Sequence, residues 1–145
     1  MNREAIYSAL FSTIQGIAIT AGVKTIGRRL VHWSDVPSSD QPAIFQVQRH
    51  EDPMPHKRGL PTEWKLAADI YVYVNTGQDP HASPAIMLNP ILDALDALFP
   101  ASSENIQTLG GLVSHCWIAG RIETSEGSLG SQEVAIIPIE ILAPI

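Results

Sequence analysis

The stretch WKLAADIYVYV, residues 64–74, decides the fold because its apolar side chains alternate with mixed ones along its whole length. Strict alternation is typical of a β-strand with one buried face. The apolar face consists of Trp64, Leu66, Ala68, Ile70, Val72 and Val74. The opposite face carries Tyr71 and Tyr73 beside Lys65 and Asp69. This stretch therefore predicts a strand that covers a core on one side and presents aromatic residues on the other.

Four further segments predict strands around this one. AIFQVQR, residues 43–49, alternates clearly, and TIGRRLVHW, residues 25–33, alternates less regularly. On the C-terminal side, LVSHCWIAGRIET spans residues 112–124 and EVAIIPIEILA spans residues 133–143. Because strands that follow one another in sequence usually pair, we expect mostly antiparallel neighbours.

Helical patterns lie at two places. Residues 2–15 carry an apolar stripe at helical spacing, with Asn2 as a plausible N-cap. Residues 83–99 begin with Ser83 and Pro84, and Pro90 either kinks this helix or starts a new turn. The order predicts one α+β domain over residues 1–145. It is a mostly antiparallel sheet of about five strands with both helices packed on one face.

Composition and charge exclude several classes of function. A net charge of -6 argues against nucleic-acid binding, which needs a basic face. The single cysteine, Cys116, excludes an internal disulfide and a cysteine-rich zinc site, and we interpret it as a small core residue. No run approaches the roughly 18 apolar residues of a membrane helix. We therefore expect no membrane contact and assembly in the cytoplasm.

The last predicted strand is apolar on both faces. Two helices can cover only one side of the sheet, so the second face needs another cover. This surplus consists of Val134, Ile136 and Leu142, together with Tyr71, Tyr73 and Trp117. Contiguous apolar surface of this kind indicates an interface with a subunit or partner. The alternative is that a loop or a curved sheet buries it within the monomer. Pro138 lacks a ladder donor and predicts that this strand lies at a sheet edge.

The segment RHEDPMPHKRGLPTEW, residues 49–64, holds several possible metal ligands: His50, Glu51, Asp52 and His56. Prolines interrupt them, and they lack the regular spacing on a rigid element that a metal site requires, so we predict no metal. A solvated hairpin loop and an arm that touches a partner both remain open. Long loops are uncommon unless they are used. For the arm, the predicted docking residues are Arg49, His56, Lys57 and Arg58.

No enzyme signature emerges from the remaining residues. His115 and Cys116 are adjacent on a predicted strand, so their side chains point to opposite faces and cannot form a nucleophile pair. LGG at 109–111 lacks the rest of a phosphate-binding motif. Asp93 and Asp96 lie on the polar face of a helix. We therefore predict no catalytic residue and no cofactor.

The order of segments resembles a known family. The chain runs through RRLVHWSDVP, QPAIFQVQR, GLPTEWKLAADIYVYV, LNPILDALDALF and TLGGLVSHCWIAGRIET. It is similar to the tail terminator, or tail-completion, proteins of tailed bacteriophages. The resemblance implies an α+β fold that assembles into a ring, commonly a hexamer, on the head-proximal end of the tail tube. Such a ring ends tube polymerisation and offers a surface to the neck proteins of the capsid.

The resemblance thus implies a homo-oligomer, the tail tube protein and neck or connector proteins as partners, and a place in the virion. It brings no cofactor and no catalytic residue. Two other interpretations remain. One is another neck or head–tail connector protein. The other, from a different class, is a small bacterial metal- or ligand-binding module that uses the loop 50–61.

Overall fold

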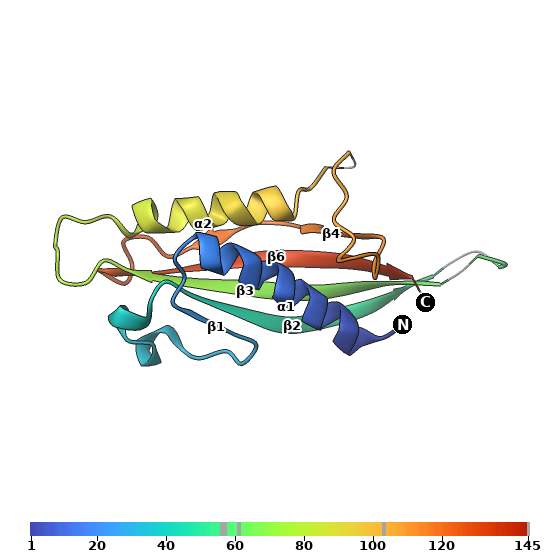
Figure 1. Cartoon of the computed structure of the whole chain (residues 1–145), viewed down its shortest axis with the longest axis horizontal. Coiled ribbons are helices and arrows are strands. Elements are labelled where there is room, and N and C mark those ends of the chain that lie inside the picture. Colours follow the sequence, from blue (N-terminus) through green and yellow to red (C-terminus); the bar gives the residue numbers. More distant parts are fainter. Residues whose placement is uncertain (56–57, 61, 103, 145) are drawn as a thin grey trace.

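The computed structural model describes residues 1–55, 58–60, 62–102 and 104–144. Within them lie helices α1 (Arg3–Thr20) and α2 (Pro84–Leu98), and two 3₁₀ turns, η1 (Trp33–Asp35) and η2 (Ser38–Asp40). The strands are β1 (Thr25–Gly27), β2 (Ala43–Met54), β3 (Glu63–Asn75), β4 (His115–Ile118), β5 (Glu123–Thr124) and β6 (Gln132–Pro144). Figure 1 shows them as one elongated sheet with the helices laid across it. No helix in the described part of the chain is long and apolar enough to cross a membrane.

The sheet has the order β1-β2-β3-β6-β4, and β5 pairs with β6 beside β4. Only β1 is parallel to its neighbour among the described pairings, so the sheet is mostly antiparallel. Two long strands, β3 and β6, pair without interruption from Glu63↔Pro144 to Asn75↔Gln132 and form the centre of the sheet. The predicted α+β class is confirmed, with six strands where about five were expected.

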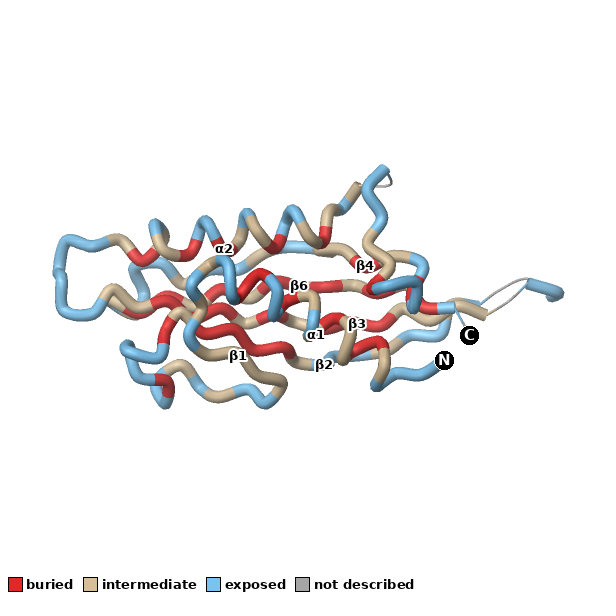
Figure 2. Tube along the Cα trace, in the orientation of Figure 1, coloured by how far each residue is buried: buried red, intermediate tan, exposed pale blue. Residues whose placement is uncertain are grey.

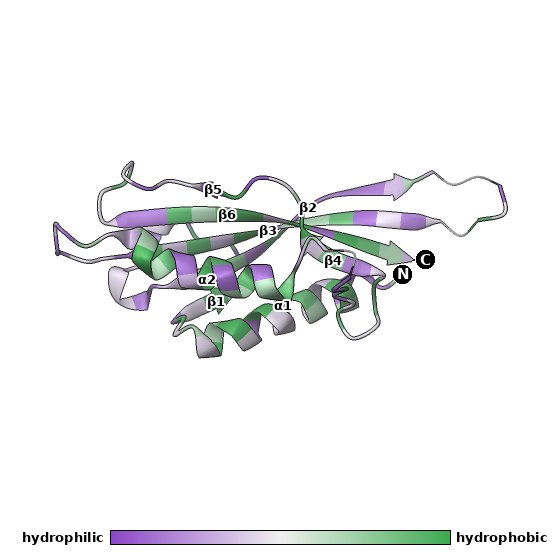
Figure 3. Cartoon of the chain, turned by 90° about the horizontal axis from the view of Figure 1, so that it is seen from above, coloured by the Kyte–Doolittle hydropathy of each residue, from purple (hydrophilic) through white to green (hydrophobic). Residues whose placement is uncertain are grey.

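Both helices cover the same side of the sheet, as Figure 3 shows from above. We call this side the helix face and the opposite side the outer face. The helices contribute buried Tyr7, Leu10, Ile14, Leu88, Ile91, Leu95 and Phe99 to one core, which contains Ile70, Val72, Ile137 and Ile139 from the two central strands. In β6 the burial alternates from residue to residue, which Figure 2 shows as a banded strand. The predicted helices are confirmed, and α1 extends beyond residue 15 to Thr20.

The position of β6 corrects the prediction drawn from Pro138. β6 is a central strand, bonded to β3 on one side and to β4 and β5 on the other. Pro138 lies between the segments that pair with β4 (139–142) and with β5 (135–136). Its carbonyl oxygen accepts from Ala119 N at 3.0 Å, so its ring nitrogen faces the same flank, where no strand continues. The missing donor is therefore harmless in the middle of the sheet.

Two predicted strands are shorter than expected. The segment 25–33 is a strand only as far as Gly27, and Arg28, the next residue, pairs with Glu4 of α1 at 2.5 Å. The segment 112–124 is broken into β4 and β5 at Gly120, whose φ of 114° is a conformation that other residues rarely adopt. Charged side chains and glycine thus override a weak alternation.

Residues 28–41, which we call the outer flap, fold across one end of the outer face. They bury a second cluster of Val36, Ala43, Phe45 and Tyr73, with Val31, Trp33, Tyr71 and Val134 packed partly against it. The alternative in which a loop covers the second face is therefore correct at this end of the sheet. Farther along β3 and β6, no described segment covers the outer face as the helices cover the helix face.

Candidate functional site

The predicted interface residues lie together on the outer face. Tyr71 stands opposite Ile136 and Tyr73 opposite Val134 across the β3–β6 pairing. Leu142 lies between Lys65 of β3 and His115 of β4. Trp117 follows on β4, where its ring neighbours His115 at a centroid distance of 4.9 Å. Tyr71, Trp117, Val134, Ile136 and Leu142 are all half-buried, and we call these five residues the outer stripe. That they contact a partner remains a prediction.

Tyr73 differs from the other five predicted interface residues. It is only 2% exposed, and its hydroxyl donates to the Val31 carbonyl at 2.7 Å. Burial, with a smaller contribution from Tyr71, raises the pKa of Tyr73 to about 12. The flap already occupies this side chain, so we remove Tyr73 from the set available to a partner.

Arg49 belongs to the outer face rather than to the tip of an arm. Its Nε lies 2.6 Å from Asp69 Oδ2, and its Nη2 donates to the Tyr71 hydroxyl. The guanidinium also stands 5.8 Å from the centroid of the Tyr71 ring. The hydrogen bond and charge of Asp69 raise the pKa of Arg49. Arg49 thus places a paired positive charge beside the outer stripe, away from the position the sequence suggested.

The predicted loop 50–61 begins as strand, because β2 continues through residues 50–54. The β2–β3 pairing continues to Met54↔Glu63, after a bulge between Gln48 and Glu51. We call the portion from Glu51 to Trp64 the hairpin arm, and Figure 1 shows it extending beyond the rest of the sheet. His56 and Lys57 lie outside the described residues. Arg58 is exposed, and Leu60 is 59% exposed.

The base of the hairpin arm is tied to the start of α1. Arg3 Nε lies 2.5 Å from Glu51 Oε2, and the Arg3 guanidinium stands 5.1 Å from the Trp64 ring centroid. Tyr7 donates a weaker hydrogen bond to Glu51 at 3.3 Å. These contacts join the base of the arm to the first turns of α1.

Among the possible metal ligands in this region, Glu51 points away from His50 and Asp52. Glu51 is directed to Arg3 and Tyr7 on the helix side, whereas His50 Nε2 lies 3.8 Å from Asp52 Oδ2. In residues 1–55, 58–60, 62–102 and 104–144, no group of three or more His, Cys, Asp or Glu side chains could hold a metal ion. His56, which the sequence offered as a ligand, is outside those ranges.

Cys116 and His115 lie on opposite faces of β4, as predicted. Cys116 is fully buried in the core, and burial raises the pKa of its thiol. His115 lies on the outer side against Trp117. The two groups therefore form no nucleophile pair.

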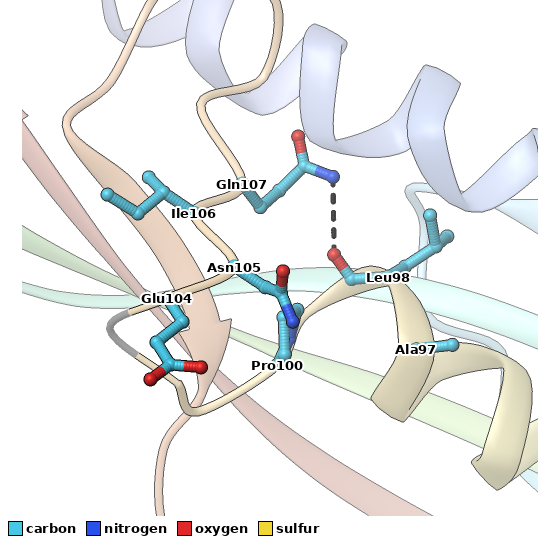
Figure 4. A pocket seen from close by; sticks show the side chains of 7 residues that line it. All are labelled: Ala97, Leu98, Pro100, Glu104, Asn105, Ile106 and Gln107. Atoms are coloured by element: carbon cyan, nitrogen blue, oxygen red, sulfur yellow. Dashed lines mark hydrogen bonds between the residues drawn. The ribbon is translucent and has the colours of Figure 1, made fainter.

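A small hollow of about 370 Å³ lies where α2 ends, shown in Figure 4. Gln107 Nε2 donates across it to the Leu98 carbonyl at 3.2 Å. Glu104 is the one titratable side chain among its described lining residues. This hollow has no arrangement of groups that could carry out a reaction.

Two features escaped the sequence analysis. One is the outer flap, whose apolar Val31, Trp33 and Val36 were the available signal. The other is an apolar groove between α1 and α2, lined in part by small residues that were assigned to no surface. The only signal in the sequence was the set of small residues on the two helices. It could not indicate a groove without knowledge of how the helices pack.

Comparison with known proteins shows that other solved structures share this fold. No family model matches the chain, and no curated protein matches it either. One similar solved structure, of a protein whose name gives no function, is 14% identical with a TM-score of 0.57. The match covers 100% of this chain and 96% of that one. A second is a chain in the virion of a native gene transfer agent particle, 10% identical with a TM-score of 0.51, covering 95% and 93% of the two chains. At these identities the likeness establishes a shared fold over nearly the whole chain.

Proposed function

We propose that this protein is a structural protein of a phage-like virion. In this proposal it forms a ring that caps the head-proximal end of the tail tube, ends tube polymerisation and offers a surface for joining the head. It acts by assembly and carries out no reaction. Its partners are other copies of itself, the tail tube protein and the neck proteins.

The observation that carries the proposal is the shared fold. A chain of a gene transfer agent virion has this fold over 93% of its length, so the architecture occurs in a protein that is part of a particle. The segment order resembles that of tail terminators, and this resemblance supports a position at the end of the tail within the particle. Fold alone does not define function, so the surface features must supply the rest.

Two surface features support an assembly role. The outer stripe leaves half-buried aromatic and aliphatic side chains on a sheet face that the helices do not cover. Surface of this composition is typical of interface cores. The hairpin arm adds a second contact region beyond the sheet, anchored at its base by Arg3 and Glu51. Together they give one chain two separate places to hold neighbours.

Electron microscopy of particles from a strain that lacks this protein tests the proposal. Tail tubes of uncontrolled length are expected if the protein caps the tube. Tails of normal length that fail to join heads would assign it to the neck instead. Normal, complete virions would overturn both assignments.

The ligand-binding interpretation has its own measurement. Elemental analysis of the purified protein by mass spectrometry would show bound zinc or another metal, and a His50→Ala/His56→Ala double variant would show whether the arm holds it. A metal-loaded monomer would replace the assembly proposal, whereas a metal-free ring by light scattering supports it.

A further inference from the structure

A groove of about 570 Å³ runs between the two helices on the solvent side of the helix layer. Its walls are mostly small or apolar: Gly16, Ile17, Ala21, Pro90, Ala94 and Ala97. Gly16 has no heavy atom within 4 Å of the place where a side chain would begin. The helices therefore leave an open apolar slot where larger side chains would have closed the layer.

The surface around the groove is apolar and acidic. Ile19 on α1 is 85% exposed and Ile86 on α2 is 75% exposed. Residues 4–20 and 84–98 contain no lysine or arginine. Asp93 is exposed on α2, three residues after Pro90 and four before Ala97, spacings that place neighbouring side chains on the same side of a helix. A ligand for this slot should therefore combine an apolar anchor with a positive charge.

The hairpin arm of the same sequence has that combination. Leu60 is 59% exposed, more than any other described leucine, and exposed Arg58 lies two residues before it. The described residues of the arm lie beyond one end of the sheet, whereas helices α1 and α2, which line the groove, lie over the sheet itself, as Figure 1 and Figure 3 show. A monomer therefore does not fill its own groove, but a neighbour can.

We propose that Leu60 of one copy docks into the α1–α2 groove of a second copy, with Arg58 beside Asp93. This contact joins two different surfaces, so each subunit can give an arm to one neighbour and receive an arm from another. Such heterologous contacts generate closed rings when the rotation closes. The inference deepens the proposed ring and rests on it for its biological use, but the contact itself is measurable without a tail.

An engineered cysteine pair tests the contact. In a Leu60→Cys/Ala94→Cys variant, mild oxidation of concentrated protein should produce covalent multimers whose linked peptides contain positions 60 and 94. The control is Leu60→Cys/Glu123→Cys, with an exposed second position on β5. Native Cys116 is fully buried and stays out of the reaction. A docked pair should link about tenfold faster than the control, because docking raises the effective concentration of the thiols.

Reversing the charge supplies a second readout. Adding Arg58→Glu to the cysteine pair should slow the 60–94 linkage, and so should raising the salt concentration, because exposed charges are screened. Linkage no faster than the control pair would overturn the proposed contact. If neither Arg58→Glu nor added salt changes the rate of 60–94 linkage, the predicted contact between Arg58 and the acidic side of the groove is wrong.

The outcomes separate this inference from the proposed function. Uncontrolled tail length in the deletion strain, together with no 60–94 linkage, would reject the contact and leave the capping role standing. Efficient 60–94 linkage together with normal virions in that strain would reject capping and leave the self-association standing.

Discussion

Gln41 and Gln132 face each other amide to amide in the interior. Gln41 Nε2 donates to Gln132 Oε1 at 2.9 Å, and Gln132 Nε2 donates to Gln41 Oε1 at 3.0 Å. Gln132 Nε2 also reaches the Val74 and Glu133 carbonyls, and Gln41 Nε2 reaches the Val36 carbonyl. The pair fastens the end of the outer flap to the beginning of β6, two segments far apart in the sequence.

Gln132→Ala should therefore destabilise the protein by about 2–3 kcal/mol, since it leaves the buried Gln41 Oε1 without its donor and removes the hydrogen bonds to the Val74 and Glu133 carbonyls. Chemical denaturation measures this. Gln15→Ala on the exposed side of α1 is the matched control and should change the unfolding free energy by no more than about 0.5 kcal/mol. Equal effects of the two substitutions would contradict the role of the pair.

Leu95→Ala should cost about 2–5 kcal/mol, because Leu95 is fully buried between α2 and the sheet and its removal leaves a cavity. Ile86→Ala on the same helix removes a side chain that is 75% exposed and should cost less than about 0.5 kcal/mol. Thermal or denaturant unfolding compares the two variants. A Leu95→Ala variant as stable as Ile86→Ala would show that α2 does not pack on the sheet in this way.

Glu133 should make the protein less stable as the pH rises above 4.5. The side chain is 1% exposed and one carboxylate oxygen has no hydrogen-bond partner. Burial, followed by the charge of Glu126, raises the pKa of Glu133 above its usual 4.5. The folded state then holds its proton in a range where the unfolded state has lost it, so ionisation opposes folding.

Glu133→Gln should accordingly raise the melting temperature at pH 7, and its advantage over the natural protein should shrink as the pH falls toward 4.5. Glu123→Gln, on an exposed side chain, serves as the control and should leave the pH profile unchanged. A Glu133→Gln variant with an unaltered profile would show that this carboxyl is solvated.

Cys116 should not react with a thiol reagent in the folded protein. The side chain is fully buried and burial raises the pKa of its thiol, so both access and thiolate are lacking. Addition of denaturant should release one reactive thiol per chain. Rapid labelling at pH 8 without denaturant would mean that β4 opens readily from the edge of β6.

Shortening the hairpin arm should abolish the proposed assembly on the tail tube but preserve the fold of the chain. Residues 55–62 can be replaced by Asn-Gly, a dipeptide that closes a two-residue hairpin between the last paired residues, Met54 and Glu63. The melting temperature should stay unchanged, because the tip contributes nothing to the described core. Electron microscopy should then show tails without a cap, whereas normal virion yield would refute a role for the arm.

Much of the fold follows from side-chain alternation alone. β3 and β6 extend only one residue beyond each predicted end, because every second residue from Trp64 to Val74 and from Ala135 to Ala143 is apolar. The apolar stripes also located both helices, although α1 extends five residues beyond its predicted end at residue 15. These elements obey local rules that agree with the final packing.

The remaining errors have a common cause, since they depend on contacts between distant segments. Pro138 suggested an edge, but the gap between β4 and β5 accommodates it in the centre. The weak strand at 25–33 ends at Gly27, and Arg28 beyond it pairs with Glu4 of α1, which is distant in sequence. The arm looked like a loop, since its prolines hid a ladder that continues to Met54↔Glu63. Sequence periodicity contains no information on such long-range pairings.

The one-sided placement of the helices has a consequence for tolerance to mutation along β6. Odd-numbered residues from Ala135 to Ala143 face the core of their own chain, while even-numbered residues lie on the outer face, where Val134 packs partly against the outer flap and Ile136 to Leu142 lie farther along the strand. A saturation mutagenesis scan of β6, measured once for protein accumulation and once for particle completion, should therefore show effects that alternate from one residue to the next. Odd positions would set how much folded protein a cell accumulates, and, under the proposed assembly role, even positions from Ile136 to Leu142 would set how many particles that protein can complete.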